Sequence, residues 1–118
     1  MPIAVPLFVS LGLLLTMTSL SVGLGVALPP DTLLPIHFNF VGAPDNFASK
    51  TLALSLLPIA IAVATIIFAL GPRINRRINA IPGTYTLIWL FVVLALAVGH
   101  GFIIRGALFA LQAASAAA

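Results

Sequence analysis

The sequence predicts an all-α membrane protein with three transmembrane helices and a structured extracytoplasmic loop between the first and second helices. Of the 118 residues, 62% are hydrophobic and only 6% are charged, whereas about a quarter of the residues in a soluble domain are charged. The mean hydropathy is +1.27. So few charged side chains do not cover a globule with polar surface, and we therefore expect the chain to lie in lipid.

Three apolar stretches, at residues 7–28, 51–70 and 85–104, define the spans of a single membrane domain at residues 1–118. Each reaches the roughly 20 residues that a helix needs to cross a bilayer. Because lipid offers the backbone no hydrogen-bond partner, each stretch should be a helix. A secretory signal is the alternative for the first stretch, but no Lys or Arg precedes its apolar run.

The basic residues predict the orientation. The linker at residues 71–84 contains arginines and no acidic residue, so the positive-inside rule places it in the cytoplasm. The loop at 29–50 and the tail at 105–118 are then extracytoplasmic, with the N-terminus in the cytoplasm. Three side chains of the linker are expected to contact lipid phosphate: Arg73, Arg76 and Arg77.

Individual glycine, proline and aromatic residues refine the predicted spans. We expect Gly71 and Pro72 to end the second helix, and Tyr85 and Trp89 to lie in an aromatic belt at the inner interface. The third helix has no proline beyond Tyr85. It must therefore project outward, tilt, or break near Gly106.

The polar loop contains "PIHFNF" at residues 35–40, in which apolar and polar side chains alternate. In an extended strand this pattern places Ile36, Phe38 and Phe40 on one face and the polar residues between them on the other. The "GAPDN" that follows is typical of a turn, and either Asp45 or Ser49 is available to cap the second helix.

The run "LPPDTLLPIHFNFVGAPDNFASK", residues 28–50, resembles the signature of a membrane domain of unknown function. That domain forms the N-terminal half of the SdpI-like immunity proteins. The resemblance covers about residues 1–80, and Pro72 with Arg73 also fits it, although Gly71 stands where an aspartate is frequent. The residues that match the signature in order are Pro35, His37, Phe38, Asn39, Gly42, Pro44, Asp45 and Lys50.

The resemblance implies a multi-span protein of the bacterial inner (plasma) membrane whose extracytoplasmic loop is important for its function. In the immunity proteins it implies protection of a producer cell against its own membrane-active toxin, with signalling to a repressor. Those proteins continue with a second set of spans, whereas this sequence holds three.

Most ionisable side chains gather at the outer surface on this topology. We expect the loop to fold back over the helix ends, so that His37 or Asp45 meets His100 or Arg105. Ionisable groups at membrane depth suggest function. The plainer alternatives are that Asp45 only caps a helix and that His100 is an interhelical hydrogen-bonder. The expected ligand- or partner-binding residues are His37, Asn39, Asp45, Lys50, His100 and Arg105.

The sequence favours a non-catalytic protein without a metal or cofactor. It has no cysteine and no nucleophile-and-base motif. Its histidines and carboxylates do not have the spacing that is typical of a metal site. Its modest charge of +3 gives no reason to expect nucleic acid. We expect the loop to bind a peptide, toxin or partner at the membrane surface. The alternative is an accessory structural subunit that packs in the bilayer against a larger membrane protein complex or as a homo-oligomer.

Overall fold

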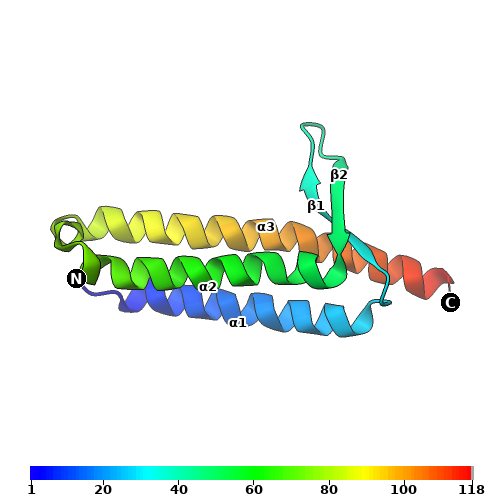
Figure 1. Ribbon diagram of the computed structural model, residues 1–118, viewed down its shortest axis with the longest axis horizontal. Helices are drawn as coiled ribbons and strands as arrows, with labels where there is room; N and C mark the ends of the chain where they lie inside the picture. Colours follow the sequence, from blue (N-terminus) through cyan, green and yellow to red (C-terminus); the bar gives the residue numbers. More distant parts are fainter. Residues whose placement is uncertain (118) are drawn as a thin grey trace.

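The computed structural model describes residues 1–117, which form three helices side by side along one axis (Figure 1). Helix α1 spans Ala4–Ala27, α2 spans Lys50–Ile74 and α3 spans Pro82–Ala117. All three are long and apolar enough to cross a membrane. The chain is therefore an integral membrane protein, and the molecule is elongated, with extents of 58 × 30 × 18 Å.

The bundle has two distinct ends. At the first, which we call the arginine end, a 3-10 helix η1 at Arg76–Ala80 joins α2 to α3 beside the N-terminus. At the other, which we call the hairpin end, strands β1 (Leu33–Phe38) and β2 (Pro44–Ser49) pair in an antiparallel sheet. The all-α expectation thus holds for the spans, but the loop between the first two helices contains a β-hairpin.

The prediction that Gly71 and Pro72 end the second helix is wrong, because α2 continues to Ile74. Proline lacks the N–H that would donate to the carbonyl four residues earlier, which is that of Phe68. The Tyr85 hydroxyl donates to this carbonyl instead, at 2.7 Å. A partner from α3 therefore satisfies the acceptor that Pro72 leaves free, and the helix passes through the proline.

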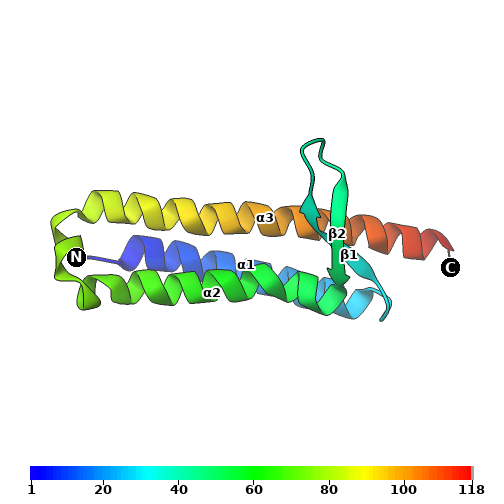
Figure 2. The same ribbon diagram turned by 45° about the horizontal axis from the view of Figure 1, so that its top comes forward.

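The third helix does not break near Gly106 but continues past residue 104 and projects beyond the predicted span, which is one of the three expected alternatives. It runs without interruption from Pro82 to Ala117, and the predicted outer tail is its last part; residue 118 lies outside the described residues. Its 36 residues correspond to about 54 Å of helix, against a hydrocarbon core of about 30 Å. Figure 2 shows its C-terminal part extending past the ends of α1 and α2.

Trp89 lies inside the bundle and not in an interfacial belt, which corrects the sequence-based expectation. Its side chain is fully buried, and its Nε1–H donates to the Ser10 hydroxyl at 2.8 Å. Ser10 in turn donates to the Pro6 carbonyl at 2.7 Å. Phe68 stacks on the indole with ring centroids 5.6 Å apart. A buried indole requires an acceptor, and α1 supplies one, so the tryptophan is accommodated in the core.

Candidate functional site

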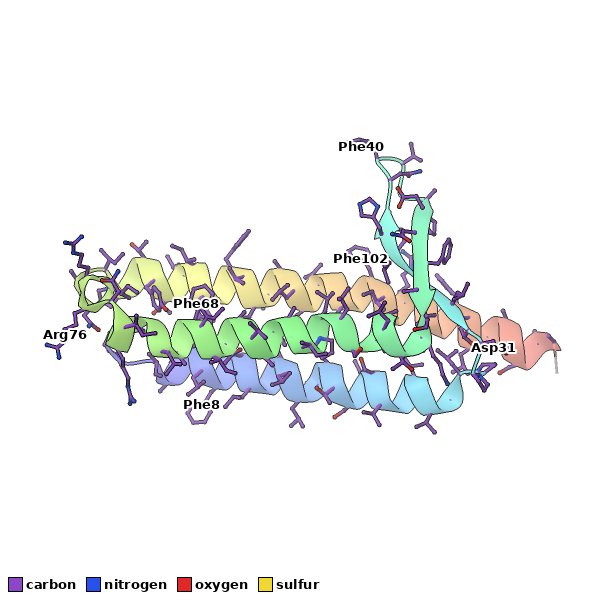
Figure 3. All side chains as sticks on the ribbon, in the orientation of Figure 1. Phe8, Asp31, Phe40, Phe68, Arg76 and Phe102 are labelled. Atoms are coloured by element: carbon purple, nitrogen blue, oxygen red, sulfur yellow. The ribbon has the colours of Figure 1, made fainter. Side chains whose placement is uncertain are left out.

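The hairpin stands out from the bundle, with its base packed on the helices and its tip away from them (Figures 1 and 3). At the base, Leu34 is fully buried and joins a cluster with residues of all three helices. At the tip, Phe40 and Val41 are fully or almost fully exposed. The buried base fixes the direction of the hairpin, and the tip carries apolar side chains without neighbours from the bundle.

Asn39 and Gly42 build the turn of the hairpin. The Asn39 Oδ1 accepts hydrogen bonds from the backbone N–H groups of Val41 at 3.1 Å and Ala43 at 3.0 Å. Gly42 has φ = 81°, a left-handed conformation that glycine adopts without a steric penalty. The predicted ligand residue Asn39 is therefore engaged by the turn itself.

His37 and Asp45 face each other across the two strands. The His37 Nδ1 lies 2.6 Å from the Asp45 Oδ1, so the ring nitrogen donates and the carboxylate accepts. Both side chains are largely solvent-accessible, with exposed fractions of 67% and 42%. Asp45 does not cap α2, since that position belongs to Ser49, whose Oγ accepts from the Leu52 N–H at 3.3 Å.

Lys50 joins the end of α1 to the start of α2. Its Nζ donates to the carbonyls of Gly25 at 2.6 Å and Leu28 at 2.7 Å. The last carbonyls of a helix have no partner within it and carry partial negative charge, which a lysine ammonium neutralises. The structure thus uses Lys50 to hold the two helices together beside the hairpin.

His100 lies in the bundle interior, and the hairpin pair does not meet it. Its Nε2 is 2.9 Å from the Ser21 Oγ, and the side chain is 1% exposed. The buried Nδ1 has no hydrogen-bond partner within residues 1–117. The expected contact of His37 or Asp45 with His100 or Arg105 is therefore wrong, because His37 and Asp45 pair with each other. The interhelical alternative for His100 is confirmed.

The hairpin instead meets α3 through apolar groups. The rings of Phe38 and Phe102 have centroids 6.3 Å apart. Pro35 lies so close to Gly106 that a Cβ there would be 3.0 Å from the proline Cγ. The absence of a side chain at Gly106 therefore allows the hairpin to pack closely against α3.

Beside this contact lies a groove of about 510 Å³ between the hairpin and α3. We call it the aromatic groove. The Arg105 guanidinium forms part of its wall, 5.2 Å from the centre of the Phe109 ring. The groove is defined by Pro35, Phe38, Pro44, Phe102, Arg105 and Phe109.

The remaining basic residues lie at the opposite end of the bundle. Arg73, Arg76 and Arg77 are all exposed, and Figure 3 shows Arg76 pointing away from the arginine end. The N-terminal amine donates to the Asn79 Oδ1 at 2.9 Å. The structure therefore separates these arginines from the hairpin residues by the length of the bundle.

Sequence reasoning did not identify the two serines of α1 that form polar contacts with α3, nor the role of Trp89 in one of these contacts. Ser10 pairs with Trp89 and Ser21 with His100, and both pairs are 79 residues apart. The equal separation follows because the two helices run in parallel, and the pairs lie about three turns apart on each. A serine in α1 matched to a polar ring in α3 at the same spacing is the signal that would have indicated this register.

These features define a class of protein, an integral membrane protein with a three-helix bundle and a β-hairpin between its first two helices. A comparison with protein families supports part of the resemblance. The family described as "Domain of unknown function (DUF1648)" matches residues 30–62, which contain the hairpin and the first half of α2. No curated protein and no solved structure matches the chain. Among residues 1–117 there is no group of three potential metal ligands.

Proposed function

We propose that the chain is a small, non-catalytic membrane protein whose hairpin binds a peptide, toxin or protein partner at the outer membrane surface. The observation that carries this proposal is the exposed apolar tip, Phe40 and Val41, held away from the bundle. Exposed apolar groups on a projecting element are typical of interaction sites. The positive-inside rule supports an outward-facing hairpin end, because the arginines lie at the opposite end.

The signature residues support the same site in a specific way. His37, Asn39, Gly42, Asp45 and Lys50 each have a structural task in the hairpin or at its attachment. The signature therefore encodes the arm, whereas the tip side chains lie outside it. On this proposal the tip determines which partner binds.

The resemblance to SdpI-like immunity proteins suggests the biological role. The family match covers all eight signature residues, and an arm at the outer surface suits a protein that intercepts a membrane-active toxin. We propose this role as the finer form of the function, in a bacterial inner membrane.

Site-specific photo-crosslinking tests the binding site. A benzoylphenylalanine is placed at position 40, and the matched control carries it at position 63, where Val63 is 51% exposed in the middle of α2. We expect a discrete protein or peptide adduct from position 40 in native membranes and none from position 63. Equal labelling from both positions, or none from either, would contradict a recognition role for the tip.

A second function, that of an accessory subunit, is favoured by a different surface. A groove of about 510 Å³ lies between α1 and α2, within the membrane-spanning part. Hydroxyl groups along it offer hydrogen bonds to a neighbouring helix. They belong to Thr18 and Thr51, whereas the hydroxyls of Ser21 and Ser55 already bond His100 and the Thr51 carbonyl.

Mass measurement in mild detergent separates the two functions. The test variant replaces both apolar side chains of the tip, Phe40→Ser with Val41→Ser. A stable complex with a larger membrane protein that persists in this variant supports the accessory subunit. Loss of the partner in that variant, with the bundle intact, supports recognition by the hairpin.

A further inference from the structure

The hairpin end carries two cations, Lys50 and Arg105, and the structure accounts for only one of them. Lys50 donates hydrogen bonds to the carbonyls of Gly25 and Leu28. Arg105 is exposed and forms no ion pair within residues 1–117, where the one ion pair joins His37 to Asp45. A guanidinium remains available to an anion from outside the chain.

The surroundings of Arg105 are aromatic and apolar. Its guanidinium rests against Phe109, and Phe102 and Phe38 continue the wall toward the hairpin. The groove they line is about 510 Å³, a volume typical of small-molecule sites. A ligand that fits must combine one anionic group with an apolar chain.

The depth of Arg105 selects among such ligands. Tyr85 lies at the arginine end, and the helix rises about 30 Å between Tyr85 and Arg105, which matches the thickness of the hydrocarbon core. Arg105 therefore reaches the level of the lipid phosphates when the arginine end lies at the opposite surface. At that level phospholipid is the most abundant molecule with an anionic group and apolar chains.

We propose that the aromatic groove binds one phospholipid of the adjacent leaflet, with its phosphate on Arg105 and an acyl chain along Phe102 and Phe109. Arginine is well suited to phosphate because two parallel N–H donors match two phosphate oxygens. The groove lies where the hairpin meets α3, so the bound lipid also contacts Phe38. This site requires only that the hairpin end lies at a bilayer surface, and it is independent of the function proposed for the tip.

Native mass spectrometry of the full chain, released from nanodiscs of phosphatidylglycerol, tests the proposal. We expect the protein to retain one phosphatidylglycerol, and Arg105→Gln to weaken this binding about tenfold or more, since a hydrogen bond to a charged group is lost. The control is Gln112→Ala, which removes an exposed polar side chain of the same helix outside the groove lining and should leave retention unchanged. Phe109→Ser should weaken binding without removing the cation.

Two further arms identify the ligand. Diacylglycerol, which has the chains without the phosphate, should not be retained, and millimolar inorganic phosphate should not displace the lipid. Displacement by inorganic phosphate would overturn the lipid assignment in favour of a simple anion site. Unchanged retention in Arg105→Gln, or a peptide found in place of the lipid, would overturn the proposal. Helicity by circular dichroism establishes that each variant is folded.

Discussion

The His37 Nδ1 and the Asp45 Oδ1 lie 2.6 Å apart across the hairpin. This pair links the two strands next to the turn that Asn39 and Gly42 form. Its consequence is that the loop's histidine and this aspartate bond to each other, and within residues 1–117 their side chains form no hydrogen bond with a helix. The outer part of the polar loop is held by contacts within the hairpin, which explains how it projects from a bundle made of apolar helices.

The first prediction concerns this pair. Asp45→Asn should loosen the hairpin with little effect on the bundle, because an exposed ion pair contributes about 0–1 kcal/mol. Hydrogen exchange should accelerate at the N–H groups of Asn39 and Gly42, which bond within the turn, and remain unchanged in α3. Exchange that accelerates equally in α3 would show that the pair supports the bundle.

The second prediction concerns Lys50. Lys50→Met should lower the free energy of unfolding by about 2 kcal/mol or more, because hydrogen bonds to a charged donor contribute about 1.5–3 kcal/mol each. Unfolding in a denaturing detergent measures the change. Arg73→Met, which removes an exposed cation from the other end, is the control and should be neutral. If both variants unfold alike, the contacts of Lys50 with α1 do not stabilise the protein.

The third prediction concerns Gly71. A Cβ at this position would overlap the Tyr85 hydroxyl, so Gly71→Ala should disturb the hydrogen bond from Tyr85 to the Phe68 carbonyl. Adding Tyr85→Phe removes the obstructing oxygen and should recover part of the lost stability. Gly12→Ala, where nothing lies within 4 Å, should be neutral or stabilising by about 1 kcal/mol. Fully additive effects of Gly71→Ala and Tyr85→Phe would contradict the contact.

The fourth prediction concerns Ser10 and Trp89. A double-mutant cycle of Ser10→Ala and Trp89→Phe should give a coupling energy of about 1 kcal/mol, the contribution of one neutral hydrogen bond. The cycle of Ser10→Ala with Tyr85→Phe serves as the control, because Tyr85 bonds to Phe68 and not to Ser10. A first cycle with no coupling would show that the buried contact contributes nothing.

The fifth prediction concerns orientation. In intact cells, an impermeant thiol reagent should label a cysteine placed at Asn39 and should fail to label one at Asn75. Both positions are exposed in the structure, so any difference reports the side of the membrane. Labelling of position 75 with protection of position 39 would reverse the orientation on which the proposed function depends.

The sequence by itself determined the class of protein, the three spans and the place of the polar loop. Hydropathy and local backbone preference establish these features, because a bilayer requires each span to satisfy its own backbone. The extended segment with alternating residues and the turn were also readable, since proline, asparagine and glycine act locally.

Only the tertiary structure decided which side chains meet. The Tyr85 hydroxyl satisfies the Phe68 carbonyl that Pro72 leaves free, Pro35 lies against α3 at Gly106, and the Ser10 hydroxyl accepts a hydrogen bond from the buried Trp89 Nε1–H. Each of these outcomes depends on a partner from another element, whose position is set by helix register and packing. No local pattern encodes that register. For this reason the predicted end of the second helix, the predicted position of Trp89 and the predicted histidine contacts were wrong, although the three apolar stretches do form helices long and apolar enough to cross a membrane.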